Sequence, residues 1–279
     1  MTDLGEGVWS FQAPLWQTNS LLAVSGGDTL LCDPAFTPAE IEAIGMELAQ
    51  RTAGRSFLLV THADYDHVCG IPYFPGVEVA AGPETAARIR DGTAGNGLRS
   101  GGDEWGVAWP SELRVDRELA AGAELELGSF RIAAIDAPSH GREGVCFVLR
   151  EQGILLPGDN LSAITIPLLG GSLARACEAT ERLLDVLDRC TLRHVVPGHG
   201  PVLSPERARQ IGEEDLRYLE ALVAAAREAA SEGMSRGYAL VHVYAVEPPR
   251  SSTIDFDIYD IRGGNARLAL KEYGTQPDA

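Results

Sequence analysis

The chain has 279 residues and a formal net charge of −17; 45% of its residues are hydrophobic and 23% are charged. This composition predicts a globular protein that can bury a sizeable core. The acidic charge argues against nucleic acid and anionic membranes as partners, because both are bound by basic surfaces, so we expect a small-molecule substrate.

The cysteines and the N-terminal residues bear on the compartment. Five cysteines form an odd set without CxxC spacing, which is typical of reduced thiols in a cytoplasmic protein. Residues 1–6 lack the basic and apolar regions of a secretory signal. No apolar stretch approaches the roughly 20 residues that cross a bilayer. We therefore predict a cytoplasmic protein without a membrane segment.

Short apolar runs separated by turn residues predict strands in the first third of the chain. A helix is expected after Thr37, because Thr37 can serve as its N-cap, Pro38 suits its first turn and Glu40 completes a capping box. The run 56–60 is apolar, as in a strand buried on both faces. The predicted strands are residues 20–24, 29–32, 56–60 and 77–80, and a second helix is expected over 83–90.

Residues 91–118 interrupt this pattern. They are rich in glycine and contain Trp105 and Trp109, so they predict a long irregular loop, which in compact domains is often functional. The two tryptophans are candidates for the lining of an apolar substrate pocket, together with Tyr65. The alternative is that all three side chains pack the loops onto the core.

The second half of the chain repeats the alternation of strands and helices. Strands are predicted at 124–127, 130–135, 144–149, 154–156 and 194–196, and helices at 172–190, 204–232 and near the end of 255–273. This order predicts an α/β (α+β) fold in which helices cover two sheets. We expect one domain over 1–279, completed by C-terminal helices from about residue 204. The apolar stripe of the long helix predicts core packing, with a homodimer contact as the alternative.

The richest cluster of polar residues directly follows a predicted strand. In Val60-Thr-His62-Ala-Asp64-Tyr-Asp66-His67, two histidines and two aspartates occupy six residues. Histidine nitrogens and carboxylate oxygens are the ligands that zinc and related divalent ions take from proteins. A strand that ends in such a cluster positions its side chains rigidly, so these residues predict part of a metal site.

Three further junctions of strand and turn each present a ligand-type residue. His140 follows Pro-Ser, and Asp159 and His199 each follow Pro-Gly. His194 and His242 lack such a setting, and we interpret them as packing residues. Two metal ions held about 3.5–4 Å apart can share a bridging carboxylate. The seven candidate ligands, which suffice for two ions, are His62, Asp64, Asp66, His67, His140, Asp159 and His199.

The order of these four blocks resembles the metallo-β-lactamase superfamily, whose signature is HxHxDH followed by a distant His, an Asp and a His. The resemblance runs from about Asn19 to His199 and includes the Asp33-Pro34 turn, where we expect Asp33 to support the loop. It implies a four-layer αββα sandwich with metals at the sheet edges. It also implies that His62, the residue at 64 and His140 hold one metal, that Asp66, His67 and His199 hold the other, and that Asp159 bridges them.

One position departs from that signature, because Asp64 stands where the family has histidine. An anionic oxygen donor weakens the metal as a Lewis acid and makes iron or manganese more acceptable. Zinc remains our first choice for the two divalent ions. The alternatives are that one metal site is lost, or that Asp64 only hydrogen-bonds a histidine ligand.

The resemblance implies a hydrolase, similar to glyoxalase-II-like and lactonase-like members. A metal-bound hydroxide, oriented by Asp66, would attack the carbonyl of an ester, thioester, lactone or amide of a small molecule. One alternative is a di-iron redox enzyme of the same fold, because such members carry acidic residues in the first motif. The other is a non-catalytic binding protein whose first metal site has degraded.

Overall fold

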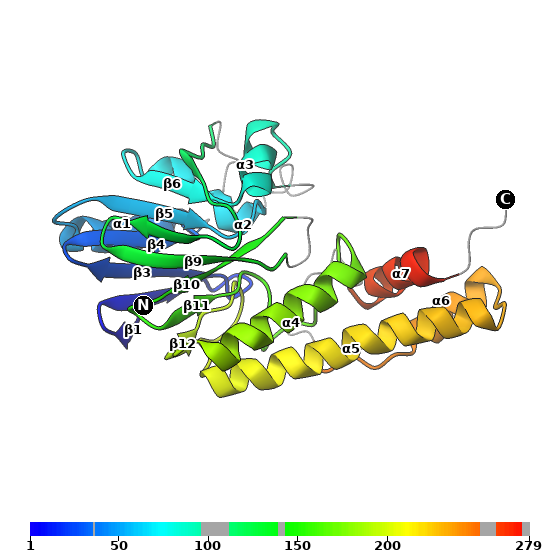
Figure 1. Cartoon of the computed structure of the whole chain (residues 1–279). Coiled ribbons are helices and arrows are strands. Elements are labelled where there is room, and N and C mark those ends of the chain that lie inside the picture. The colour runs from blue at the N-terminus through cyan, green and yellow to red at the C-terminus, as the bar shows by residue number, and fades with distance from the viewer. Residues whose placement is uncertain (36, 96–111, 139–142, 252–260, 275–279) are drawn as a thin grey trace.

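A computed structural model describes the chain except residues 36, 96–111, 139–142, 252–260 and 275–279 (Figure 1). The strands are β1 (Thr2–Gly5), β2 (Val8–Gln12), β3 (Asn19–Ser25), β4 (Asp28–Cys32), β5 (Ser56–Val60), β6 (Glu78–Ala81), β7 (Arg117–Glu118), β8 (Glu124–Leu127), β9 (Phe130–Asp136), β10 (Val145–Leu149), β11 (Ile154–Leu156) and β12 (His194–Val195). The α-helices are α1 (Pro38–Arg51), α2 (Tyr65–Val68), α3 (Pro83–Arg90), α4 (Leu173–Arg189), α5 (Pro205–Ser231), α6 (Arg236–Tyr244) and α7 (Ile261–Tyr273).

The strands form two sheets. The seven-stranded sheet has the order β1-β2-β3-β4-β5-β6-β7, and the five-stranded sheet has the order β12-β11-β10-β9-β8. Strands β4 to β7 pair in parallel, as do β11 and β12, whereas the other neighbours are antiparallel. The carboxyl ends of the parallel strands in each sheet therefore present their loops along one edge.

The alternation of side chains along the strands creates a four-layer structure. In β5, Phe57 and Leu59 belong to the cluster between the two sheets, while Leu58 and Val60 belong to the cluster beneath α1. On the five-stranded sheet, Val148 of β10 belongs to the cluster that includes residues of α4 and α5. The order of layers is helix, sheet, sheet, helix, which confirms the predicted αββα sandwich (Figure 1).

Local sequence signals place most elements where they were expected. Glu40 accepts hydrogen bonds from the backbone N–H and the hydroxyl of Thr37, which is the predicted capping box of α1. Ser204 caps α5 by accepting from the backbone N–H of Arg207. The structure adds β1, β2, β7, α2 and α6, which the sequence pattern did not reveal. Within the described ranges, no helix is both long enough and apolar enough to cross a membrane.

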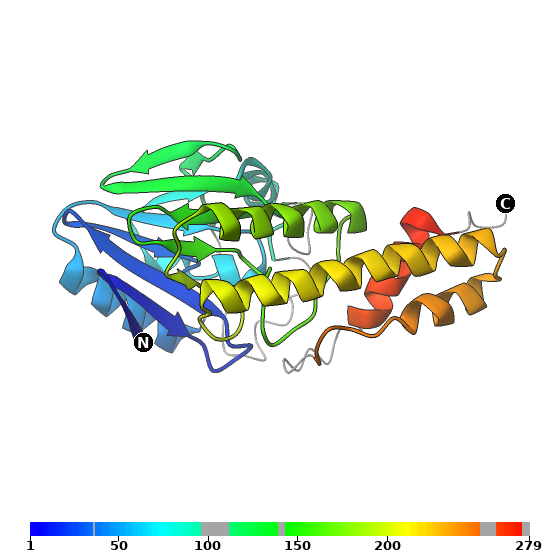
Figure 2. The ribbon, with the colours of Figure 1, turned by 60° about the horizontal axis from the view of Figure 1, so that its bottom comes forward.

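The C-terminal helices build a core to which none of the described strands contributes a residue. Helix α5 runs along α4 and then extends past the sandwich, where α6 and α7 pack against it (Figures 1 and 2). Leu222 of α5, Val243 of α6 and Ala266 of α7 share this cluster with residues 166–176. The long helix therefore covers the five-stranded sheet with its first half and organises a helical extension with its second half.

A buried ion pair ties α5 to the segment that follows α6. Asp215 is 5% exposed, and its Oδ1 accepts a 2.5 Å hydrogen bond from Arg250. Burial raises the pKa of Asp215 from its ordinary value of 3.8 to about 7, although Arg250 opposes the shift. Because the folded-state pKa lies above the unfolded one, Asp215 costs stability progressively as the pH rises through this range.

As the pH rises from about 5 to about 8, the free energy of unfolding of Asp215→Asn should increase relative to that of the wild type, because asparagine does not ionise. Each unit of difference between the folded and unfolded pKa of Asp215 corresponds to about 1.4 kcal/mol. The variant also loses the ion pair at every pH, so the difference between the two stability curves is the quantity to follow. Urea unfolding of both proteins across this range measures it. Parallel curves would show that Asp215 titrates at the same pH in the folded and unfolded chains.

Candidate metal centre

The carboxyl end of β5 delivers three of the predicted ligands. His62 lies in the turn that follows β5, and Asp66 and His67 lie on the single turn of α2. All three are buried, with relative exposures of 2%, 6% and 0%. The rings of His62 and His67 lie side by side, with centroids 4.1 Å apart. The sheet and the short helix thus fix these side chains before any ligand arrives.

Two loops of the five-stranded sheet face this cluster. Asp159 follows β11 and His199 follows β12, each after a Pro-Gly turn. The backbone N–H of Gly198 donates to the carbonyl of Gly158 at 2.6 Å, which ties the two loops together. A Cβ atom at Gly198 would collide with Asp159 Oδ1, so this close approach requires glycine.

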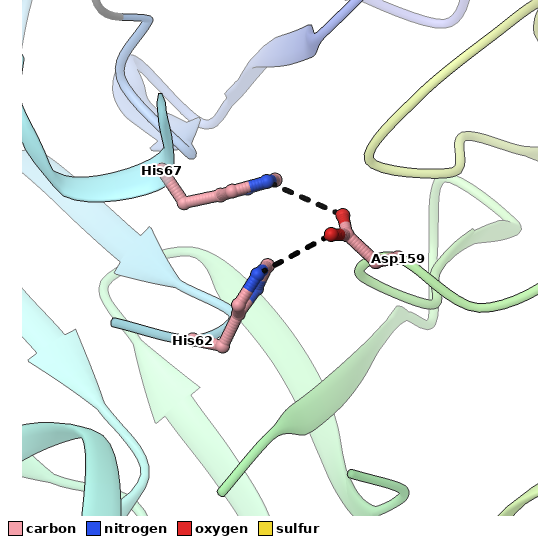
Figure 3. A group of neighbouring side chains, drawn as sticks. All are labelled: His62, His67 and Asp159. Atoms are coloured by element: carbon pink, nitrogen blue, oxygen red, sulfur yellow. Dashed lines mark ion pairs between the residues drawn. The ribbon is translucent and has the colours of Figure 1, made fainter. Parts of the chain in front are cut away.

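The two halves meet around the carboxylates. Asp159 points toward His62 and His67, with Oδ2 3.5 Å from His62 Nε2 and Oδ1 3.2 Å from His67 Nε2 (Figure 3). His199 Nε2 lies 3.5 Å from Asp159 Oδ2 and 3.4 Å from Asp66 Oδ2. Among the described residues, two groups bring their ligand atoms within 4.8 Å of one another: His62 with His67 and Asp159, and Asp66 with His67 and His199.

The chemistry of this donor set fits a divalent cation. Burial opposes protonation of His67, yet the carboxylates of Asp66, Asp159 and Asp33 hold its pKa well above the usual value. Burial likewise opposes protonation of His199, and Asp159 and Asp66 raise its pKa. The cluster therefore favours positive charge at its centre, and a metal ion can supply that charge while the imidazoles stay neutral.

Asp33 supports the centre from behind His67. Its Oδ2 lies 2.9 Å from His67 Nδ1, and the backbone N–H and hydroxyl of Thr61 donate to Asp33 at 2.9 and 2.8 Å. A carboxylate at Nδ1 keeps the proton on that nitrogen and turns the lone pair of Nε2 toward the site. The Asp33-Pro34 turn directly after β4 predicted only that Asp33 supports the loop, and the contact with His67 is an additional role.

Two residues from the β2–β3 connection hold the opposite side. Thr18 donates its hydroxyl hydrogen to Asp66 Oδ2 at 3.0 Å, and the carbonyl oxygen of Trp16 lies 3.0 Å from His199 Nδ1. The carbonyl can only accept, so His199 carries its proton on Nδ1 and presents Nε2 to the carboxylates. No sequence pattern pointed to Thr18 or Trp16, because their role depends on the β2–β3 connection reaching across to the other sheet.

The structure places an arginine beside Asp64. Asp64 belongs to neither of the two groups, although it immediately precedes α2. Its Oδ1 lies 3.5 Å from Arg88 Nη1 of α3, and Arg88 also forms an ion pair with Glu143. Helix α3 therefore brings a cation to the one position at which the motif departs from its usual histidine.

A family model described as the metallo-beta-lactamase superfamily matches residues 13–199, which is more than half of the chain and includes every predicted ligand. The chain belongs to the metallo-β-lactamase superfamily. The matched region ends at His199, so α5, α6 and α7 lie outside it.

Similar members of the superfamily include two named as thioesterases. The chain is 26% identical over 237 residues to an acyl-coenzyme A thioesterase, MBLAC2, of Gallus gallus, covering 73% of this chain and 81% of that protein. It is 23% identical over 244 residues to an atrochrysone carboxyl ACP thioesterase of Aspergillus terreus, covering 84% of this chain and 66% of that protein. These names and the superfamily identify the chain as a hydrolase.

A solved structure shows the same fold. The metallo-β-lactamase family protein TTHA1429 of Thermus thermophilus superposes with a TM-score of 0.66 at 20% identity, covering 97% of this chain and 94% of that one. The match extends beyond the sandwich, because it covers nearly all of both chains.

A pocket adjoins the metal centre of this superfamily member. Asp159 and His199 contribute to its wall, and the rest comes from the loop 160–169 and from α4 and α5. Its apolar lining residues are Leu161, Ile166, Pro167, Leu168, Leu169, Ala176 and Leu219. A ligand bound to the metal centre could therefore place an apolar group between the loop and the two helices.

The remaining predicted site residues divide into two sets. His140, Trp105 and Trp109 lie outside the described residues. Tyr65 is fully buried and packs in a small cluster with Ala13 and Cys69, so the structure gives it the packing role that was the alternative to pocket lining.

Proposed function

We propose that this protein is a zinc-dependent hydrolase that cleaves the carbonyl–sulfur bond of small acyl thioesters. The observation that carries the proposal is the convergence of three imidazole Nε2 atoms and two carboxylates at the mouth of an apolar-lined pocket. Imidazole and carboxylate donors together suit zinc. A divalent ion bound there would acidify a water molecule and polarise the carbonyl oxygen of the substrate.

The residues of the chain contribute positioning and proton handling. Thr18 fixes Asp66 through its 3.0 Å hydrogen bond, so the Asp66 carboxylate can orient a water molecule and accept its proton. Asp159 lies between the histidines that follow β5 and the histidine that follows β12, so it links the two halves of the centre. Both carboxylates are held in place by their contacts with neighbouring side chains.

Two features favour a thioester over the other carbonyl substrates. The similar proteins from Gallus gallus and Aspergillus terreus are named as thioesterases. A thiol has a pKa of about 8.5, so it leaves as a thiolate without a protein acid.

The proposal is tested by assaying the hydrolysis of acetyl, butyryl and hexanoyl thioesters, with the released thiol as the measured product. We expect hydrolysis that is lost after chelation and restored by zinc, and slower hydrolysis of oxygen esters, lactones and amides with the same acyl group. Thioester hydrolysis that survives complete metal removal, or activity confined to the other substrates, would contradict it. Restoration by iron but not zinc would overturn the assignment of the metal.

The pocket predicts how the acyl group is selected. Ala176 of α4 lines it, and we expect Ala176→Leu to lower kcat/KM for the hexanoyl thioester about 10-fold or more, because a few methylene groups of misfit cost roughly 1–3 kcal/mol. The acetyl thioester should be hydrolysed almost as before. The matched control is Ala174→Leu, which lies on the same helix outside the pocket lining. Equal losses for both acyl groups would argue against acyl binding there.

A further inference from the structure

We infer that Asn265 of α7 is a positioning residue of the acyl pocket, because its side-chain amide holds the backbone of residues 167–169 in the pocket wall. This role rests on the proposed function and adds to it a determinant of acyl selectivity. Asn265 is fully buried in the helical extension, and it lies outside residues 13–199, the range that the superfamily model matches.

Part of the pocket wall has no regular secondary structure. Residues 160–172 precede α4 and form neither helix nor strand. Three consecutive residues of this stretch, Pro167, Leu168 and Leu169, line the pocket. Buried backbone groups outside helices and strands need hydrogen-bond partners from elsewhere in the chain. The course of this wall therefore depends on the groups that pair with its backbone.

Asn265 supplies two of these partners. Its Nδ2 donates to the carbonyl oxygen of Pro167 at 2.7 Å, and its Oδ1 accepts from the backbone N–H of Leu169 at 3.1 Å. A side-chain amide presents a donor and an acceptor side by side, as a peptide group does, so the two bonds fix both the position and the direction of the loop. Nδ2 also donates to the hydroxyl of Tyr218 on α5 at 3.4 Å, which anchors Asn265 itself.

Two further residues from the C-terminal part of the chain hold the ends of this wall. Arg250 donates to the carbonyl oxygen of Thr165 at 3.3 Å. Glu272 of α7 accepts at 3.0 Å from the backbone N–H of Leu173, the first residue of α4, where α7 adjoins α4 (Figure 1). The segment that follows α5 thus holds the backbone of the wall at several points, and Asn265 holds its centre.

A wall that is fixed before the substrate arrives binds an acyl chain without the cost of ordering a loop. This advantage grows with the number of acyl carbons that touch the wall. It should therefore be large for a hexanoyl group and small for an acetyl group, whose methyl group ends next to the carbonyl carbon. The described contacts of Asn265 include no candidate metal ligand, so zinc binding should not depend on it.

The variant Asn265→Leu removes these hydrogen bonds at similar side-chain volume. We expect kcat/KM for the hexanoyl thioester to fall at least 10-fold, mainly through KM, while the value for the acetyl thioester and the zinc affinity stay within about threefold. The variant Asn265→Asp keeps an acceptor for Leu169 but loses the donor to Pro167, so its loss should be intermediate.

The matched control is Ala239→Gly. Ala239 is a buried residue of α6, the helix of the same extension that packs against α5 and α7. Glycine weakens a helix interior, so this variant should lower thermal stability. It should leave the ratio of hexanoyl to acetyl kcat/KM unchanged, because the bonds from Asn265 to the wall remain.

Thioethers of the same thiol separate this role from the proposed function, because they cannot be hydrolysed. Binding of the S-hexyl and S-methyl thioethers to the zinc-loaded protein is measured by calorimetry. We expect the wild type to bind the S-hexyl compound at least 10-fold more tightly than the S-methyl compound. Asn265→Leu should reduce this difference to less than about threefold.

Each outcome decides the question. Thioester hydrolysis with the same acyl preference in the wild type and in the folded Asn265 variants would overturn the inference and leave the proposed function intact. Thioether discrimination that depends on Asn265, without any thioester hydrolysis, would overturn the proposed function and support the role of Asn265 in the pocket. Should the variants fail to fold, hydrogen exchange of the wild type decides, because the Leu169 amide should exchange at least 100-fold more slowly than in an unfolded chain. Rapid exchange there would overturn the inference.

Discussion

Asp159→Ala should abolish tight zinc binding and lower thioester hydrolysis by more than about 100-fold. Removing a residue that only hydrogen-bonds a metal ligand costs up to about 100-fold, and the loss of a ligand should cost more. The Asp159 carboxylate approaches three imidazoles, those of His62, His67 and His199, whereas the Asp66 carboxylate approaches only those of His67 and His199. Without the Asp159 carboxylate, the centre loses both a ligand and a negative charge that lies beside three imidazoles.

Calorimetric zinc titration and kcat/KM, measured on the same preparation, check this expectation. The matched control is Asp136→Ala, which lies in the same five-stranded sheet but whose half-exposed carboxylate forms ion pairs with Arg175 and Arg182 of α4. It should keep zinc affinity and hydrolysis within about threefold of the wild type, because surface ion pairs contribute little. Tight zinc binding by the Asp159 variant would remove Asp159 from the ligand set.

Asp33→Asn should weaken zinc binding and hydrolysis by about 10–100-fold without altering any ligand. The asparagine oxygen can still accept from the backbone of Thr61, but its NH₂ group then faces His67 Nδ1. That contact favours the tautomer with its proton on Nε2, which removes the lone pair that the metal needs. The positive φ of 49° at residue 33 is tolerated by asparagine, so the backbone is preserved.

The distinguishing measurement is the tautomeric state of His67, read from the nitrogen chemical shifts of the apo protein. Asp28→Asn is a matched control, because Asp28 also accepts hydrogen bonds from the backbone of two residues, Arg55 and Ser129, far from the centre. It should lower thermal stability but leave zinc affinity unchanged. An Asp33 variant that binds zinc as tightly as the wild type would reduce Asp33 to the loop support that its sequence context predicted.

Several features followed directly from the sequence because their causes are local. The apolar run at β5 and the polar cluster after it predicted a buried strand that delivers His62, Asp66 and His67. The start of α1 at Pro38 followed from its capping box. The strand β1 escaped prediction because Thr2–Gly5 is largely exposed and offers no apolar alternation. Helix α6 is short and buries few side chains, so its periodicity is weak.

The sequence thus pointed to five side chains that the structure brings together, but not to the residues that support them. Strand ends and Pro-Gly turns identify His62, Asp66, His67, Asp159 and His199 as residues that a layered fold can gather at one edge. Whether Asp33 faces His67, or whether Arg88 faces Asp64, depends on how β4 and α3 pack against β5 and α2. Those pairs are 34 and 24 positions apart in the sequence, and no local signal links them. The sequence alone determined which chemistry this chain can carry, because residue type and strand periodicity are local properties. Only the tertiary structure decided that Asp33 lies against His67 and that Arg88 lies beside Asp64, because these contacts are made by packing between elements.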